Sequence, residues 1–334
     1  MKAIELKTTL ISLIDGQIPV FLWGSPGVGK SSLVAQIAKQ KDMKFIDLRL
    51  SLLDPTDLRG IPFFDNAEKS AVWAKPEFFP DSTSEDFGIL FLDEINSAPP
   101  TIQAAAYQLI LDRKIGEYHL PKNYSIVAAG NFETDRGVTY RMPTPLANRF
   151  VHLEFDLDFE SWKLWAYGAN IDARIIAYLS FKPENLFLFD AKSNKKAFAT
   201  PRSWEFVHNI LNSSLPKELY KEVISGTIGA ESCEEFLDFL EVMNSLPNFE
   251  DILENKEVEI PTKNSVLYAT CSGLVYALQE DERKESISNV IDFSLLLPSE
   301  FCVMLIRDLQ KANIQIEHST SWNNWVEKNG FLLA

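Results

Sequence analysis

Residues Gly24 to Ser31 have the types and the spacing that a phosphate-binding loop requires. They read Gly-Ser-Pro-Gly-Val-Gly-Lys-Ser and fit the Walker A pattern G-x-x-x-x-G-K-S. Glycines let the backbone turn so that N–H groups point at phosphate oxygens. Lys30 would bring a positive charge to the β- and γ-phosphates, and the Ser31 hydroxyl would ligate Mg²⁺. The predicted nucleotide-contacting set is Gly24, Ser25, Pro26, Gly27, Val28, Gly29, Lys30, Ser31 and Ser32.

Two adjacent acids, Asp93 and Glu94, follow the apolar run Ile89-Leu90-Phe91-Leu92. A carboxylate at the tip of a buried strand can hold a hydrated Mg²⁺, which is the role predicted for Asp93. Glu94 is then placed to orient and deprotonate an attacking water. Two acids at a strand end are common by themselves, but their position after a Walker A loop indicates a Walker B element.

Asn131 ends a further apolar segment, Ser125 to Gly130. If that segment is a strand beside the one that ends at Asp93, the amide of Asn131 can position the water or contact the γ-phosphate. Asparagine also commonly makes turns, so a turn at Asn131 is the alternative.

The elements that must position these residues alternate between strand and helix. Apolar runs predict strands at residues 20–23, 45–48, 89–92, 125–129 and 151–155. Apolar residues at helical spacing predict helices over 30–39 and 101–110. Strands separated by helices indicate an α/β fold with a five-stranded parallel sheet and flanking helices. We therefore expect an α/β nucleotide-binding core at 1–155, a mainly α-helical lid at 156–285 and a helical extension at 286–334.

Composition excludes several classes of protein. The formal net charge is −15, which argues against a broad nucleic-acid surface. No apolar run is long enough to cross a membrane, and the first residues do not resemble a signal peptide. Cys233, Cys271 and Cys302 are too far apart for a zinc pattern and are expected to be buried thiols. These features favour a cytoplasmic protein.

These motifs resemble those of the AAA+ superfamily, and among its members the MoxR-like ATPases. The similarity covers roughly residues 5–215 and includes Leu92 to Asn96, Ala129 to Asn131, Pro145 to Phe150 and Thr200 to Ser203. Residues 54–62 resemble a subgroup that is usually found beside von Willebrand factor A-like or metallopeptidase-like proteins. The resemblance implies an ATP hydrolase that uses ATP and Mg²⁺ and forms rings, usually hexamers, with the ATP sites between subunits.

The resemblance also assigns two arginines. Arg149 would be the arginine finger that reaches a neighbour's γ-phosphate, with Arg136 and Arg141 as rivals in the same segment. Arg202 would act within its own subunit from the lid. Thr200 and Pro201 favour a helix start there, where a cation opposes the helix dipole and so hints at another purpose. A helix-end contact for Arg149 and an ordinary surface position for Arg202 are the alternatives.

Two insertions resemble segments that project toward the pore or partner face in related rings. One lies between Gly60 and Phe87 and is rich in aromatic residues, and the other is Lys114 to Tyr118. For any single aromatic there, a place in a local core is the favoured interpretation. The resulting hypothesis is a chaperone-like ring ATPase that remodels or activates a protein partner. A nucleic-acid motor and a nucleotide-gated scaffold with little turnover remain alternatives.

Overall fold

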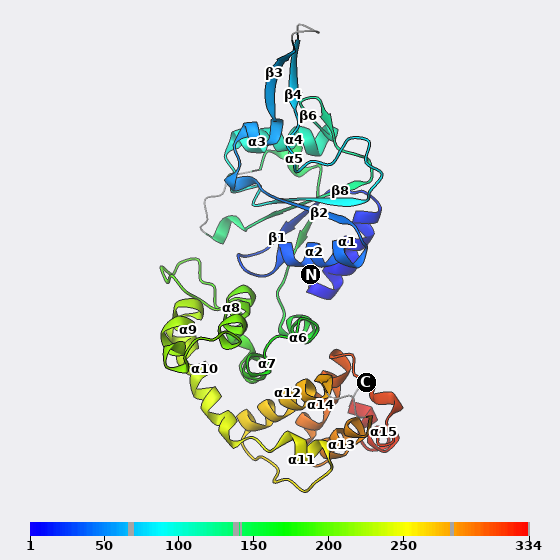
Figure 1. Cartoon of the computed structure of the whole chain (residues 1–334), viewed down its shortest axis with the longest axis vertical. Helices are drawn as coiled ribbons and strands as arrows, with labels where there is room; N and C mark the ends of the chain where they lie inside the picture. The colour runs from blue at the N-terminus through cyan, green and yellow to red at the C-terminus, as the bar shows by residue number, and fades with distance from the viewer. Residues whose placement is uncertain (66–69, 136–139, 141, 281–283, 333–334) are drawn as a thin grey trace. The chain divides into compact units, whose positions relative to one another are not determined.

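A computed structural model describes the chain except for residues 66–69, 136–139, 141, 281–283 and 333–334 (Figure 1). The chain divides into two compact units. The first contains Met1–Asp158 and Asp190–Ser193, and the second contains Phe159–Phe189 and Asn194–Ala334. The boundaries predicted at residues 155 and 285 remain predictions about domain organisation.

A five-stranded parallel sheet forms the centre of the first unit. The strands are β1 (Val20–Trp23), β2 (Lys44–Arg49), β5 (Gly88–Asp93), β8 (Tyr124–Gly130) and β9 (Val151–Glu154), in the order β2-β5-β8-β1-β9. Every neighbouring pair is parallel. The predicted α/β fold is therefore confirmed. Because parallel strands end at one edge of the sheet, this order brings the residues that follow β1, β5 and β8 together.

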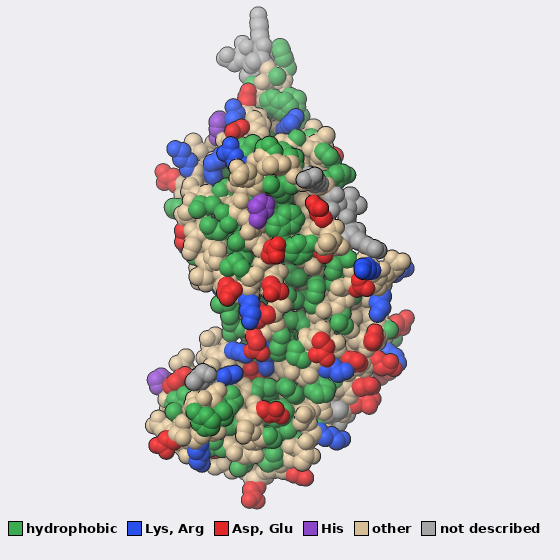
Figure 2. All heavy atoms as spheres, turned by 180° about the vertical axis from the view of Figure 1, so that it is seen from behind, with side chains coloured by type: hydrophobic (Ala, Val, Ile, Leu, Met, Phe, Trp, Pro, Cys, Tyr) green, Lys and Arg blue, Asp and Glu red, His purple; other side chains and the backbone are tan. Residues whose placement is uncertain are grey.

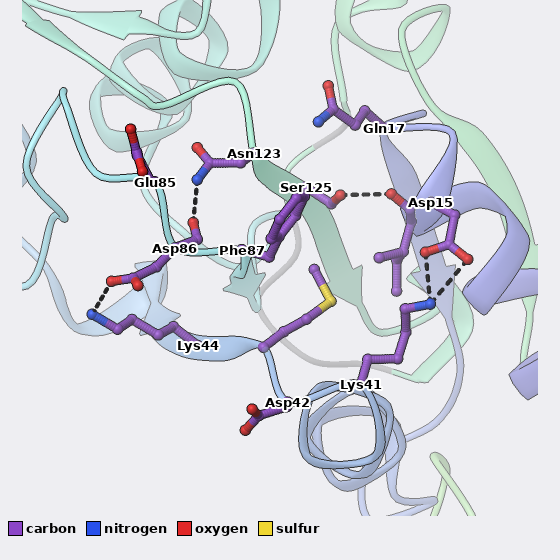
Figure 3. Close-up of a pocket in the computed structure, with 12 residues that line it drawn as sticks. Asp15, Gln17, Lys41, Asp42, Lys44, Glu85, Asp86, Phe87, Asn123 and Ser125 are labelled. Carbon is purple, nitrogen blue, oxygen red and sulfur yellow. Dashed lines mark hydrogen bonds and ion pairs between the residues drawn. The ribbon is translucent and has the colours of Figure 1, made fainter.

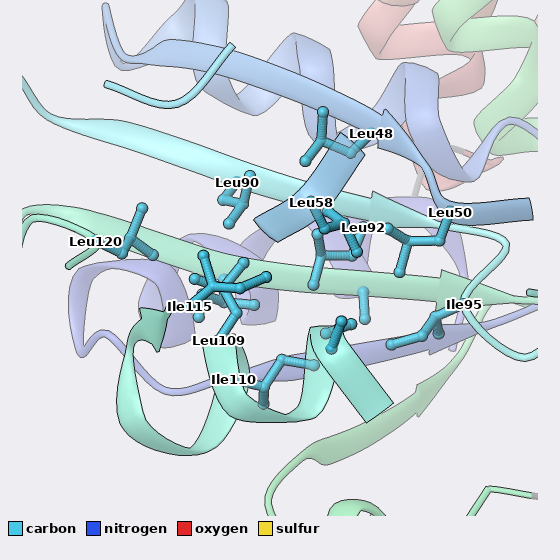
Figure 4. Close-up of a cluster of buried hydrophobic side chains, with 14 of the residues drawn as sticks. Leu48, Leu50, Leu58, Leu90, Leu92, Ile95, Leu109, Ile110, Ile115 and Leu120 are labelled. Atoms are coloured by element: carbon cyan, nitrogen blue, oxygen red, sulfur yellow. The ribbon is translucent and has the colours of Figure 1, made fainter. Parts of the chain in front are cut away.

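The same unit contains five helices and two short turns among the residues that the structure describes. They are α1 (Ala3–Asp15), α2 (Lys30–Gln40), α3 (Pro55–Arg59), α4 (Pro100–Asp112) and α5 (Thr144–Ala147), with 3-10 turns η1 (Leu50–Leu52) and η2 (Glu133–Asp135). A hydrophobic cluster joins the sheet to α3 and α4 (Figure 4). In it, Leu90 and Leu92 of β5 lie with Leu109 and Ile110 of α4. Burial on both faces of β5 explains its continuous apolar sequence.

Two antiparallel hairpins are added to this unit: β3 (Ile61–Asp65) with β4 (Ser70–Ala74), and β6 (Lys114–Ile115) with β7 (Tyr118–His119). The expected core position holds for Phe79, which is 2% exposed and stacks on Tyr118. It is wrong for Phe63 and Phe64, which are 57% and 68% exposed, and for Trp73. The physical reason is that a two-stranded ribbon without a second layer buries neither face.

The second unit is helical, as predicted for the lid and the extension. It begins with α6 (Phe159–Gly168), α7 (Ala173–Phe181), η3 (Pro183–Leu186), α8 (Pro201–Leu211), η4 (Lys217–Leu219), α9 (Tyr220–Ile228), α10 (Ala230–Val242) and η5 (Met243–Ser245). It continues with α11 (Phe249–Leu253), α12 (Asn264–Glu280), α13 (Lys284–Ser294), α14 (Ser299–Lys311), η6 (Ile316–His318), α15 (Trp322–Asn329) and η7 (Gly330–Leu332). Helix α14 packs on α12, so the last helices belong to the same compact unit.

Candidate functional site

The predicted phosphate loop connects the end of β1 to the start of α2. Gly27 and Gly29 have φ angles of 80° and 100°, which side chains with a Cβ rarely adopt. The backbone turns at these two glycines and leads directly into α2, whose first residue is Lys30. The N-terminal N–H groups of this helix lack partners within the helix and carry its positive dipole end. Ser31 is half-buried in the first turn of α2, and Ser32 is exposed.

The ammonium group of Lys30 lies inside the loop. Lys30 is 8% exposed, and its Nζ donates hydrogen bonds to the carbonyls of Gly24 and Ser25 at 2.6 and 3.2 Å. It also donates to Asn131 Oδ1 at 2.9 Å. These three acceptors are neutral. A phosphate oxygen is a stronger acceptor for an ammonium group, so it can replace them.

Asp93 lies at the carboxyl end of β5, in register with Arg49 of β2. Its Oδ1 accepts a hydrogen bond from the backbone N–H of Glu94 at 2.9 Å. Burial raises the pKa of Asp93 above its usual value, and the charge of Lys30 opposes that rise. A cation bound there would stabilise the ionised carboxylate. The chemistry of the residues, a carboxylate together with the Ser31 hydroxyl in the loop, therefore fits Mg²⁺.

Glu94 is held by a residue that the sequence did not single out. Its backbone is left-handed, with a φ of 56°, and its Oε2 accepts a hydrogen bond from Ser51 Oγ. Ser51 lies in η1, directly after β2, the neighbour of β5. The strand order places Ser51 beside Glu94, and only that order could have predicted the contact.

Asn131 follows β8, which pairs with β5, so the predicted position beside the Walker B tip is confirmed. Its side chain accepts from Lys30, and its backbone carbonyl accepts from Asn96 Nδ2 at 2.8 Å. Asn96 is buried and crosses over Gly130, where a Cβ would lie 2.3 Å from Asn96 Oδ1. Glycine at 130 is therefore required for this close packing. The Asn96 contact was not predicted.

A second unpredicted contact joins the phosphate loop to the segment after β8. Ser25 Oγ donates to Asp135 Oδ1 at 3.3 Å, and Asp135 Oδ2 accepts from the backbone N–H of Phe132 at 3.2 Å. Asp135 thus bridges the loop and the residue that follows Asn131. In the sequence, its only signal was an acid four residues after Asn131.

The two arginines with predicted roles, Arg149 and Arg202, lie in different compact units. Arg149 is exposed and lies two residues after α5. Arg136 and Arg141 lie outside the described residues. Arg202 is exposed in the first turn of α8, which belongs to the second unit, whereas the loop and Arg149 belong to the first. The predicted start of α8 is confirmed, since Thr200 and Ser203 form a capping box there.

A hollow of about 770 Å³ lies at the edge of the sheet opposite to the one that carries the phosphate loop (Figure 3). It is at the amino ends of β2, β5 and β8, where the exposed Phe87 lies between the ion pairs Lys41–Asp15 and Lys44–Asp86. The phosphate loop follows the carboxyl end of β1. The hollow is therefore a separate feature from the nucleotide site.

The cysteines, the acidic side chains and the helices bear on whether the chain holds a thiol site, a metal site or a membrane span. Cys233, Cys271 and Cys302 are buried free thiols, as predicted. Among the residues that the structure describes, no three His, Cys, Asp or Glu side chains are grouped to hold a metal ion. A site with one carboxylate and a hydroxyl, completed by phosphate and water, is the usual arrangement for Mg²⁺. Within the same residues, none of the helices combines the length and the apolar character that a membrane span requires.

Residues 19–152 match the family described as "ATPase family associated with various cellular activities (AAA)". The match extends from just before β1 into β9 and includes every residue of the phosphate loop. This segment is therefore an AAA-type ATPase domain.

Solved structures similar to the chain include three with TM-scores of 0.38 to 0.39. A candidate ATPase from Cytophaga hutchinsonii is 17% identical, with 91% of this chain and 80% of that one covered. A single-substitution mutant of RuvB from Thermotoga maritima is 19% identical, with 75% and 74% covered. NtrX from Brucella abortus in complex with ADP is 14% identical, with 98% and 64% covered.

Proposed function

From the AAA-type ATPase domain over residues 19–152, we propose that this chain is a Mg²⁺-dependent ATP hydrolase of the MoxR type that forms a ring and acts on a protein partner. The observation that carries the proposal is the grouping at one sheet edge. Lys30 of the phosphate loop contacts Asn131 after β8, and its charge acts on Asp93 at the end of β5. Glu94 follows Asp93 directly.

The proposed site binds the triphosphate through the loop. Lys30 exchanges its neutral acceptors for phosphate oxygens, and the N–H groups at the start of α2 point at the same charge. Ser31 and Asp93 would hold Mg²⁺, which neutralises charge on the phosphates when it is bound. Asn131 moves from Lys30 to the γ-phosphate or the attacking water.

Glu94 is the proposed general base. In the structure its carboxylate accepts a hydrogen bond from Ser51, so that contact must break before Glu94 can take a proton from water. The contact favours slow turnover until the site is rearranged. It is also the observation that keeps the alternative open, a nucleotide-gated scaffold with little hydrolysis.

Arg149 is the proposed trans-acting residue. Its guanidinium is exposed and can reach a neighbouring subunit, where a planar, permanent cation would stabilise charge in the transition state. Arg202 is proposed to contact the nucleotide of its own subunit from α8. The MoxR resemblance supports both roles and the ring, usually a hexamer.

The proposed partner surface is the β3–β4 hairpin. Ile61, Phe63, Phe64 and Val72 are all exposed, and Figure 2 shows hydrophobic side chains at this end of the first unit. Such an apolar surface is typical of a protein-binding site. The family resemblance favours a von Willebrand factor A-like or metallopeptidase-like partner. The net charge of −15 argues against a nucleic-acid motor.

The proposal can be tested with mixed subunits. Glu94→Gln removes the base, and Arg149→Ala removes the finger, so each variant alone should bind ATP but hydrolyse it at least about 100-fold more slowly. If the site is shared, a mixture should recover part of the activity. Arg59→Ala, another exposed arginine of this unit, is the matched control and should keep wild-type turnover. Failure of the mixture to recover, where mixed rings form, would exclude a finger acting in trans.

A further inference from the structure

His152 of β9 uses both ring nitrogens to join two separate elements. Its Nδ1 lies 2.9 Å from Trp23 Nε1, and its Nε2 lies 2.8 Å from the carbonyl oxygen of Ala147. An indole nitrogen can only donate, so Nδ1 must accept and the ring proton must be on Nε2. Nε2 therefore donates to Ala147. This assignment follows from the partners, and it leaves neither nitrogen unsatisfied.

On one side the bridge ends at the phosphate loop. Trp23 is the last residue of β1 and is followed by Gly24, whose carbonyl accepts from Lys30. The Trp23 ring also stacks on Phe132, with the ring centres 6.3 Å apart and the planes at 13°. Phe132 follows Asn131. Trp23 is thus connected by sequence to the phosphate loop and, through its contact with Phe132, to the segment that contains Asn131.

On the other side the bridge ends two residues before Arg149. Ala147 is the last residue of α5, which is a single turn of four residues. Such a short helix has little internal stability, and its final carbonyls need partners from outside. Within the segment, Ala147 O accepts only the long bond from Phe150 N–H at 3.3 Å. His152 provides a shorter one from a neighbouring strand.

Ring contacts fix the imidazole itself. It stacks on the Trp23 ring, with the ring centres 6.1 Å apart and the planes at 21°. It meets the Phe150 ring edge-on, with the ring centres 6.3 Å apart. Phe150 is buried and directly follows Arg149. His152 is exposed on its edge strand, yet its ring is held by two hydrogen bonds and by the rings of Trp23 and Phe150.

We propose that His152 is a positioning residue for Arg149, and that the Trp23–His152–Ala147 bridge couples the phosphate loop of one subunit to the finger it presents to the next. The inference rests on the proposed trans role of Arg149. When nucleotide binding moves Gly24 and Asn131, Trp23 moves with them, and His152 transmits that change to α5. Adjacent ATP sites would then respond to one another.

The test uses His152→Phe, which keeps a ring of similar size and removes both hydrogen bonds. Because the hydrogen bond to the Ala147 carbonyl is lost, kcat should fall about ten-fold. KM for ATP should stay within about two-fold, because the loop residues of the same subunit are unchanged. Mixing with Glu94→Gln subunits should restore turnover, since those subunits present an intact Arg149. A defect in the variant's own site would not be restored.

Two related variants separate the halves of the bridge. A Gln side chain places its amide near the position of Nε2, so His152→Gln can still donate to Ala147 and should recover most of kcat. Trp23→Phe removes the other hydrogen bond; it should keep kcat within about two-fold and lower the Hill coefficient for ATP. Faster amide hydrogen exchange at residues 147–150 in His152→Phe would report the loosened segment directly.

The Arg149→Ala mixture is run alongside and separates the two possible failures. If Arg149→Ala is rescued and His152→Phe is not, the positioning role is wrong and the shared site stands. If neither is rescued, the shared site is wrong and the positioning role is overturned with it. Unchanged hydrogen exchange at residues 147–150 overturns the bridge whatever the kinetics show. Should His152→Phe fail to fold, His152→Gln and Trp23→Phe carry the same comparison.

Discussion

Lys30 and Lys163 are both buried lysines, one in each compact unit, and their partners differ in kind. Lys30 Nζ donates to two backbone carbonyls and to the Asn131 amide. Lys163 Nζ lies 2.5 Å from Asp308 Oδ2, and that carboxylate also accepts from the hydroxyl of Tyr167. The hydrogen bonds described for Lys30 go to replaceable neutral groups, whereas Lys163 is paired with a buried carboxylate.

The difference separates a ligand-binding cation from a structural one. A phosphate can displace carbonyls and an amide from Lys30 because it is charged and they are not. To bind Lys163, a phosphate would have to displace the Asp308 carboxylate. That carboxylate would then be buried without its cation, which costs free energy. The Lys163–Asp308 pair instead joins α6, at the start of the second unit, to α14 near its end.

The largest expected effect is on the stability of the second unit. Lys163→Met leaves Asp308 buried without its main partner and should lower the free energy of unfolding by about 3 kcal/mol. Urea denaturation followed by tryptophan fluorescence would measure this loss, and ATP affinity should not change. Adding Asp308→Leu should restore most of it. The exposed pair Lys195–Glu231 provides the control, and Lys195→Met should cost less than about 0.5 kcal/mol. Equal costs at the two sites would contradict the comparison.

Lys30→Met should have the next largest effect, on nucleotide binding. The loss of charge-assisted hydrogen bonds to phosphate should weaken ATP binding by at least about 2 kcal/mol, or roughly thirty-fold. Titration calorimetry would measure the affinity. Lys39→Met, at an exposed position in the last turn of the same helix, should bind like the wild type. Wild-type affinity in Lys30→Met would refute the phosphate site.

The sequence was sufficient to predict residues whose role depends on their own neighbours in the chain. The phosphate loop, the strand that ends at Asp93 and the Thr200 cap of α8 are local patterns, and the structure places each where it was expected. Ser51, Asn96 and His152 were missed because their contacts depend on strand order. The exposure of Phe63 and Phe64 was missed because aromatic residues alone do not show whether a second layer covers them.

Ser51→Ala should change turnover by a smaller factor. Because the Ser51 hydroxyl donates to Glu94, its removal frees that carboxylate oxygen to accept a proton from the attacking water. We expect kcat at saturating Mg-ATP to rise about five-fold, the equivalent of one hydrogen bond of about 1 kcal/mol, with ATP affinity unchanged. Ser51→Thr keeps a hydroxyl and should resemble the wild type. A fall in kcat would show that Ser51 holds Glu94 in its working position.

Asp93 extends the comparison to a buried anion and gives the smallest expected effect on stability. Because burial raises its pKa in the folded chain, the ionised form costs stability at neutral pH, and that cost disappears as the pH falls through the raised value. Asp93→Asn should therefore have a slightly higher Tm than the wild type at pH 7 when no nucleotide is bound. At low pH the two proteins should have the same Tm.

The same substitution should weaken Mg²⁺-dependent ATP binding, because an amide cannot replace the carboxylate as a charged ligand. As the pH is lowered, Asp93 of the wild type becomes protonated and the apparent Mg²⁺ affinity falls. Because the pKa of Asp93 is raised, this fall should begin at a higher pH than for an ordinary aspartate. Glu94→Gln is the control for stability, since it changes the neighbouring acid and should not reproduce the rise in Tm. A lower Tm in Asp93→Asn would mean that the charge attracts Lys30 more than burial opposes it, so that Asp93 resembles Asp308 rather than a carboxylate kept for a metal ion.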